Sequence, residues 1–269
     1  MVDLPQVTAL IGLGAASGFA AGLMGVGGGM LLVPFLTAIF SAAEFAPEHV
    51  IHLAVATSLA TIAFTSLSSV RAHHQHGAVL WPIVRVLAPG ILLGSLAGAH
   101  VAALVPTVWL AYGFAFFLAF SATQLLLDRK PQPHRELPRP PGMFATGTVI
   151  GVLSSFLGGG GGFASVPFMV WCNVRIHNAI ATSAALGFPI ALAGTIGYLI
   201  AGWRAPGLPA RSAGFVYLPA LAAVAAASVL TAPLGARLAH TLDTKRLKRV
   251  FAALLYALAA YMLTKALRS

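Results

Sequence analysis

Residues 158–168 read Gly-Gly-Gly-Gly-Gly-Phe-Ala-Ser-Val-Pro-Phe, and residues 25–35 read Gly-Val-Gly-Gly-Gly-Met-Leu-Leu-Val-Pro-Phe. The same order therefore recurs at an offset of 162 − 29 = 133 residues. A second match follows each copy, since residues 52–58 and 177–183 both begin with His and end with Ala-Thr-Ser. A duplicated membrane chain with a broken helix at the same place in each half is typical of solute carriers.

The composition indicates a membrane protein. Of 269 residues, 58% are hydrophobic and only 8% are charged, and the mean hydropathy is +0.88. Soluble domains carry charge on roughly a quarter of their residues. The net charge of +10 does not indicate nucleic-acid binding, because the basic residues lie in short connections between apolar runs, where orientation signals belong. We therefore expect the chain to meet a lipid bilayer and no nucleic acid.

Eight apolar segments alternate with short polar connections. They lie at about residues 6–41, 50–70, 78–104, 107–127, 142–173, 178–201, 213–240 and 245–267. The clearest connection, 128–141, is charged, rich in proline and placed at the midpoint of the chain. The sequence therefore predicts one structural domain with a first membrane repeat at 1–127, a cytoplasmic linker at 128–141 and a second membrane repeat at 142–269.

The first segment of each repeat is too long for one ordinary span, since about 20 residues cross a bilayer. Either one bent helix crosses, or two half-length helices form a hairpin that enters and leaves on one side. With hairpins, eleven basic residues share one side and four lie opposite, whereas single crossings divide them nine to six. The hairpin arrangement fits the positive-inside rule better and inverts the second half. We predict an all-α integral membrane protein of two inverted repeats, each a glycine-broken helical hairpin plus three transmembrane helices.

The glycine runs are the first candidate for a binding site. Glycine lets backbone approach a ligand closely, and a helix that begins after such a break directs free N–H groups and a positive dipole end at it. Two such ends would bind an anion without any charged side chain. The candidate residues are Gly27, Gly28, Gly29, Gly160, Gly161 and Gly162. The small-residue spacing of Gly14, Gly18, Gly22, Gly147 and Gly151 predicts helix packing instead.

Matching polar residues follow each run. Thr57 and Ser58 in the first half correspond to Thr182 and Ser183 in the second, and their hydroxyl groups could donate to an anion. Serine and threonine in membrane helices also bond to their own backbone or to a neighbouring helix, so both interpretations stay open. His52 and His177 begin the same two helices, where a histidine can cap a helix, sense pH or bind an anion.

The sequence offers little for catalysis. His73, His74 and His76 form a small cluster, but no carboxylates accompany them, so we expect a solvated loop and no metal. All six acidic residues lie near segment ends or in connections, and an intramembrane carboxylate relay is missing. We expect no enzyme activity, no catalytic residue and no cofactor. Because intramembrane carboxylates are missing, the sequence favours an anionic substrate over a cation.

The doubled glycine-rich motif that ends in Val-Pro, followed each time by Ala-Thr-Ser, resembles the TauE/SafE family of membrane proteins, associated with export of sulfite and sulfonates. The resemblance covers residues 6–267. It implies a secondary transporter of the bacterial inner membrane that exports a small anion, sulfite or an organosulfonate, by alternating access. It points to the two glycine runs and the two Thr-Ser pairs as the site. The expected partners are the substrate, the bilayer and a second copy of the chain in a homodimer. The alternatives are a carrier of another carboxylate or inorganic anion, a membrane assembly factor, or a histidine-cluster enzyme.

Overall fold

The computed structural model describes residues 4–24, 29–75, 77–127, 136–238 and 244–268. The elements are α1 (Leu4–Met24), α2 (Gly29–Ala42), α3 (Val50–Gln75), α4 (Trp81–Leu104), α5 (Thr107–Leu127), α6 (Pro140–Phe156), α7 (Gly162–Trp171), α8 (Ile176–Gly202), β1 (Ser212–Ala213), β2 (Val216–Tyr217), α9 (Leu218–Leu238) and α10 (Thr244–Arg268). Helices dominate, and the two short strands pair antiparallel. The predicted all-α fold class is confirmed.

Several helices suit a membrane. Within the described residues, five apolar helical stretches are long enough to cross one: Val50–Gln75, Trp81–Leu104, Thr107–Leu127, Ile176–Gly202 and Arg249–Leu267. Shorter apolar stretches include Gly29–Ala42 and Gly162–Trp171, the helices that follow the glycine runs. Large apolar side chains such as Trp109, Phe116 and Leu230 are exposed, as expected for a surface that faces lipid.

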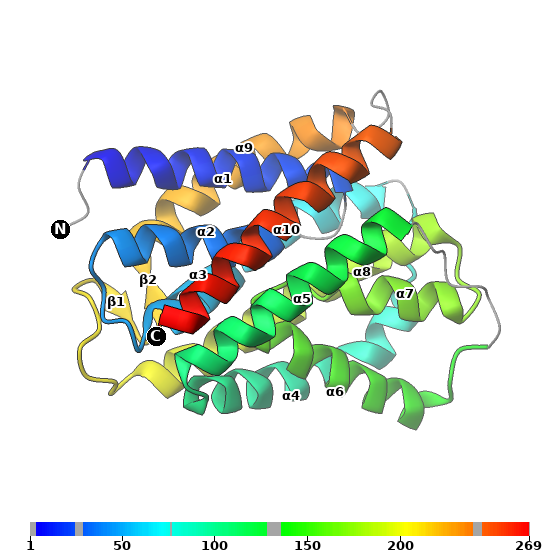
Figure 1. The fold of residues 1–269 in the computed structure, drawn as a ribbon. Helices are drawn as coiled ribbons and strands as arrows, with labels where there is room; N and C mark the ends of the chain where they lie inside the picture. The colour runs from blue at the N-terminus through cyan, green and yellow to red at the C-terminus, as the bar shows by residue number, and fades with distance from the viewer. Residues whose placement is uncertain (1–3, 25–28, 76, 128–135, 239–243, 269) are drawn as a thin grey trace.

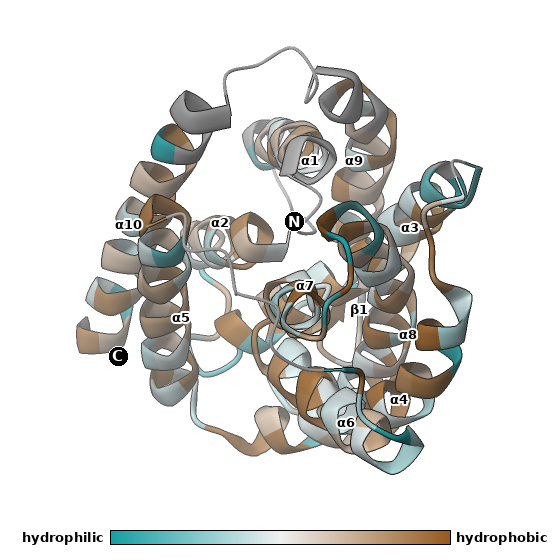
Figure 2. Ribbon diagram, turned by 90° about the vertical axis from the view of Figure 1, so that its right-hand side faces the viewer, coloured by the Kyte–Doolittle hydropathy of each residue, from teal (hydrophilic) through white to brown (hydrophobic). Residues whose placement is uncertain are grey.

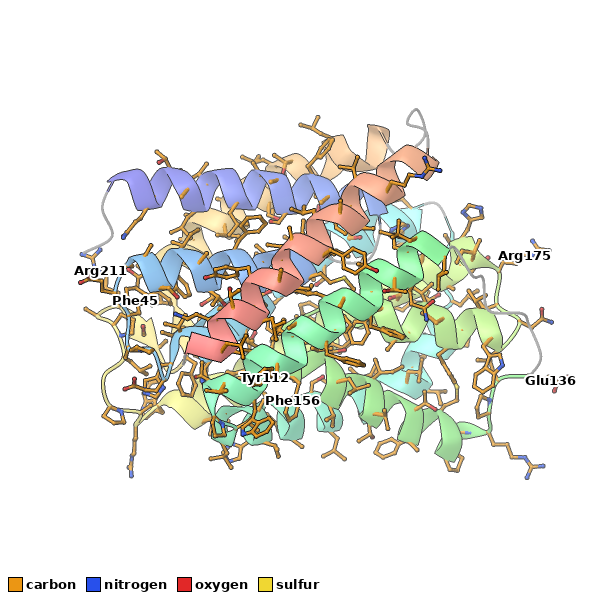
Figure 3. The ribbon with its side chains drawn as sticks, in the orientation of Figure 1. Phe45, Tyr112, Glu136, Phe156, Arg175 and Arg211 are labelled. Carbon is orange, nitrogen blue, oxygen red and sulfur yellow. The ribbon has the colours of Figure 1, made fainter. Side chains whose placement is uncertain are left out.

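The long first segment of each half turns back on itself, the first between α1 and α2 and the second at the glycine run between α6 and α7. In Figure 1, the start of α1 and the loop between α2 and α3 lie at the same end of the molecule, so α1 and α2 enter and leave from that end. Figure 3 places Phe45 and Arg211 at this end and Glu136 and Arg175 at the opposite end. Since Glu136 precedes α6 and Arg175 follows α7, the second helix pair enters and leaves from the opposite end. Each long first segment is thus a pair of helices running in opposite directions.

The two halves exchange partners. The helix α1 packs along α9 and α6 packs along α4. The first helix of each half therefore lies on the fourth helix of the other half. Figure 2 shows α1 beside α9 and α5 beside α10, with α4, α6 and α8 grouped on the other side. The helices α3 and α8 also contact each other. Two inverted repeats would produce such a matched pair of contacts. The inverted relation of the two halves and the boundaries of the repeats stay predictions.

Glycine permits the two exchanged contacts. A Cβ on Gly147 or Gly151 would lie 2.5 Å from a backbone oxygen of α4, that of Leu87 or Ile91. On α1, a Cβ on Gly14 would lie 2.6 Å from the backbone oxygen of Val224 on α9. Gly18 approaches Ser228 on α9 as closely. The predicted packing role of Gly14, Gly18, Gly147 and Gly151 is confirmed, and the surroundings of Gly22 lie outside the described part of the structure.

The helix α3 forms the centre of the core, because residues 50–62 are all buried. One feature was missed in the sequence: the segment between α8 and α9 folds back as the β1–β2 hairpin. Gly214 has a φ of +51° there and fits against Leu199, a position with no room for a Cβ. Tyr217 at the end of β2 contacts the rings of Phe40 and Phe45 edge-on, at centroid distances of 5.6 and 5.1 Å. The hairpin thereby closes the end of the molecule at which α3 begins.

Candidate functional site

The second glycine run makes a sharp break between α6 and α7. Gly158 and Gly161 have φ values of +53° and +76°, in the left-handed region that other residues rarely adopt. Gly161 is the residue that caps the N-terminus of α7, which then begins at Gly162. Because the first turn of a helix has no backbone acceptors of its own, its N–H groups point out of α7 toward the break. The run therefore places a helix N-terminus inside the molecule.

The two glycine runs contact each other. Gly29, the first residue of α2, lies so close to the second run that a Cβ on it would be 2.5 Å from the backbone oxygen of Gly158 and 2.8 Å from Cα of Gly159. The expected site residues Gly27 and Gly28 lie outside the described part of the chain. Gly160 lies beside Ile62 of α3, with 3.5 Å from its ideal Cβ position to that side chain. The structure thus places Gly29 against Gly158 and Gly159, and both Gly29 and Gly160 lie beside Ile62.

The two serines of the Thr-Ser pairs lie at the second run. Ser58 donates a hydrogen bond of 2.8 Å from its hydroxyl to the backbone oxygen of Gly158, 100 residues away in the chain. The hydroxyl oxygens of Ser183 and Ser165 are 2.7 Å apart, and Ser165 also donates to the backbone oxygen of Gly161 over 2.9 Å. All of these side chains are buried. Ser58 and Ser183 therefore hold the break in shape.

The two threonines have a different role. The Thr57 hydroxyl accepts a hydrogen bond of 3.1 Å from the backbone N–H of Tyr217, just before α9. The Thr182 hydroxyl accepts one of 3.0 Å from the backbone N–H of Leu80, just before α4. Leu80 and Tyr217 are themselves equivalent by the offset of 137 residues that relates Gly98 to Gly235. Each threonine therefore fastens its helix to the other half of the chain.

We expect Thr182→Val and Thr57→Val to destabilise the protein by about 1–3 kcal/mol each, because each leaves an N–H group near the core without an acceptor. Thermal unfolding in detergent should show a lower midpoint for both variants. Thr195→Val is the matched control, since the Thr195 hydroxyl is buried and has no hydrogen-bond partner. Equal midpoints for all three variants would contradict the assigned role.

The two histidines do not come together. His52 is buried at the start of α3, where Nε2 lies 3.0 Å from the backbone oxygen of Val105 and Nδ1 lies 3.2 Å from that of Glu48. Its ring stacks on Phe215 at a centroid distance of 5.3 Å. His177 is exposed near the start of α8, which lies at the opposite end of the molecule. Neither histidine contacts the glycine run in the described structure, and His52 fastens loops together.

The histidine cluster after α3 has a local partner. The indole N–H of Trp81 donates to Nδ1 of His74 over 3.2 Å, and the two rings meet edge-on. Within the described residues, no group of three or more His, Cys, Asp or Glu side chains could hold a metal ion. His76 lies outside that part of the chain.

Sequence reasoning overlooked two serines at the site, Ser154 and Ser165. Both are fully buried, and both flank the second glycine run, one before it and one after it. The signal available in the sequence was a difference between the two copies: Ser154 corresponds to Ala21 and Ser165 to Leu32, so only the second copy has a hydroxyl group at these positions. Comparing the copies for differences would have found them.

The site carries no charged side chain. In the described part of the chain, the buried polar side chains are serines, threonines and His52. The groups at the glycine break are therefore hydroxyls, backbone N–H groups and backbone oxygens. Such a set can bind an oxyanion by hydrogen bonds and by the positive end of a helix dipole.

Comparison with known proteins gives a consistent result. The sequence profile of the family described as sulfite exporter TauE/SafE matches residues 10–262. A protein of Haemophilus influenzae named as a probable membrane transporter protein is 34% identical over 255 residues, which cover 94% of this chain and 96% of the relative. Bacillus subtilis YdhB, also named a probable membrane transporter protein, is 29% identical over 69% of this chain and 76% of its own length. MJ0441 of Methanocaldococcus jannaschii, of the same description, is 24% identical over 94% of each chain. No solved structure matches significantly.

Proposed function

This chain belongs to the sulfite exporter TauE/SafE family, and from that premise we propose that it exports a small anion, sulfite or an organosulfonate, bound between its two glycine runs. The protein is a multi-pass membrane transporter and not an enzyme. The substrate and the site are our proposal.

The observation that carries the proposal is the meeting of Gly29 with the second glycine run. The helix pairs α1–α2 and α6–α7 enter from opposite ends of the molecule, and the start of α2, at Gly29, meets the turn between α6 and α7. A substrate held there would be reached from one face when one pair moves and from the other face when the other moves. Alternating access around a fixed central site is the mechanism that broken helices support in duplicated transporters.

The site also favours an anion over a cation. A helix N-terminus carries about half a positive charge and free N–H donors, and neither suits a cation. Export of a monovalent anion from a negative cell interior gains about 2.3 kcal/mol per 100 mV, so net export needs no ion coupling. We place the protein in the bacterial inner membrane with residues 128–141 on the cytoplasmic side, its halves at 1–127 and 142–269, and we include a homodimer in the proposal.

Flux in proteoliposomes tests the function. Vesicles that contain the purified chain and labelled sulfite, methanesulfonate or acetate should lose the two sulfur anions faster than protein-free vesicles do. A membrane potential that is negative inside the vesicles should increase the rate of release further. Release of acetate in preference to both sulfur anions would support the carboxylate carrier instead. If no anion moves above the protein-free rate, the transport proposal is wrong.

A further inference from the structure

We propose that the Ser154 hydroxyl, together with the N-terminus of α7, binds one oxygen of a singly charged oxyanion, and that this half of the site has no counterpart at the first glycine run. The inference rests on the proposed function and deepens it. It assigns a ligand-binding residue and a charge class for the substrate.

Ser154 has a buried hydroxyl with nothing to bond to. Its side chain is 0% exposed, and within the described structure its Oγ has no hydrogen-bond partner. A buried hydroxyl without a hydrogen-bond partner destabilises the folded state, so such a group calls for an explanation. A bound ligand supplies the missing partner.

The hydroxyl lies at the start of α7. Its Oγ is 3.1 Å from the place where a Cβ of Gly161 would be, and Gly161 is the N-terminal cap of that helix. The backbone oxygen of Gly161 already accepts from the N–H groups of Ala164 and Ser165 and from the Ser165 hydroxyl. The first two N–H groups of α7, those of Gly162 and Phe163, have no acceptor within the helix and face the break. Ser154 thus adds a side-chain donor beside a set of backbone donors.

The neighbouring hydroxyls are already engaged. Ser165 and Ser183 bond to each other, and Ser58 donates to Gly158. Ser154 is therefore the hydroxyl at this break that remains open, among the described residues. In the first copy the position that matches Ser154 is Ala21, and the position that matches Ser165 is Leu32. The hydroxyl groups are consequently a property of the second run, and the substrate is bound asymmetrically.

The neutrality of the donors limits the charge of the ligand. No Lys or Arg is buried among the described residues, so no full positive charge offsets the substrate. The cost of moving an ion out of water grows with the square of its charge, so a dianion costs about four times as much as a monoanion. Hydrogensulfite and sulfonates carry one charge, whereas sulfate carries two. The site should accept the former and exclude the latter.

The test compares Ser154→Ala with Ser95→Ala in the full-length protein. Ser95 is the matched control because it is fully buried, its hydroxyl has no partner, and it lies against Gly151 on the α4–α6 contact. With methanesulfonate in proteoliposomes, we expect Ser154→Ala to raise the half-saturating concentration about tenfold or more, since a hydrogen bond to a charged group is lost. Ser95→Ala should match the wild type. Sulfate should neither move nor compete.

Thermal unfolding in detergent separates a ligand role from a structural one. Methanesulfonate should raise the unfolding midpoint of the wild type and of Ser95→Ala, because a ligand that binds the folded state stabilises it. Without anion, Ser154→Ala should unfold at or above the wild-type midpoint, because an unsatisfied hydroxyl is removed, and it should show a smaller rise with methanesulfonate. If the wild type moves methanesulfonate but both variants behave alike, or if sulfate moves equally well, the inference is overturned and the proposed function stands. If the wild type moves no anion, both are overturned.

Discussion

Gly29→Ala is expected to reduce transport by about tenfold or more, whereas Gly159→Ala leaves it close to the wild-type rate. A Cβ on Gly29 would lie 2.5 Å from the backbone oxygen of Gly158 and 2.8 Å from Cα of Gly159. Both contacts are with backbone atoms, so Gly29 and the second run must separate. Such overpacking costs about 1–3 kcal/mol, which corresponds to a factor of roughly 5 to 150. Alanine favours helices more than glycine, so helix propensity at the start of α2 would not explain a loss.

Gly159 provides the matched control within the same contact. The atoms nearest to a Cβ there are 3.8 and 3.9 Å away, which is ordinary van der Waals contact. The first copy already has Val26 at the equivalent place. Flux of methanesulfonate from proteoliposomes, with equal amounts of reconstituted protein, measures both variants. Comparable losses in both variants would mean that the second run tolerates no added side chain. Wild-type activity in both variants would show that transport does not depend on the close contact of Gly29 with Gly158 and Gly159.

Gly94→Val should abolish accumulation of folded protein. On α4, Gly94 meets Thr148 of α6, where a Cβ would lie 2.8 Å from Cα of Thr148 and closer still to its backbone oxygen. Gly90 and Gly98 meet Phe144 and Val152 in the same way, so three successive turns depend on direct backbone contact. Membrane helices associate by close packing of this kind, and a branched side chain in the middle of the stripe forces the pair apart.

Gly113→Val is the control for that substitution. A Cβ on Gly113, in the membrane helix α5, would have no atom within 4 Å. Size-exclusion profiles of detergent-solubilised protein should show a monodisperse peak for Gly113→Val and aggregate or nothing for Gly94→Val. A folded, monodisperse Gly94→Val would show that α4 and α6 can part without loss of the fold.

The sequence predicted the helical fold well because its decisive signals are local and repeated. Apolar runs define membrane helices through length alone, and Gly-xxx-Gly spacing defines a packing face. The ends of α5 and α6 show this: α5 stops at Leu127, at the predicted edge of the linker, and α6 begins at Pro140, inside its last residues. The turning back of each long first segment followed from its excess length and from the distribution of Arg and Lys.

The candidate site was less accessible to sequence reasoning because hydrogen-bond partners lie far away in the chain. Thr57 was a candidate ligand by its place after the first run. Its hydroxyl oxygen instead accepts a hydrogen bond from the backbone N–H of Tyr217, 160 residues later. His52 and His177 match in sequence, but one is buried and the other exposed, since equivalent positions in oppositely directed helices begin at opposite ends of the molecule. The open hydroxyl of Ser154 can be recognised only after the bonds of its neighbours are known.

The exchanged bonds from Thr57 to Tyr217 and from Thr182 to Leu80 bear on how such a protein could arise. In an isologous contact, residue i of one subunit meets residue j of the other, and j meets i in return. A half-length ancestor that paired with a copy of itself would therefore have gained two stabilising bonds from a single change to threonine. Gene fusion would have kept both bonds within one chain and left each copy free to diverge. On this history, Ser154 opposite Ala21 would be one result of that divergence. Two half-length chains expressed together would test whether the exchanged bonds alone can hold the halves in one folded protein.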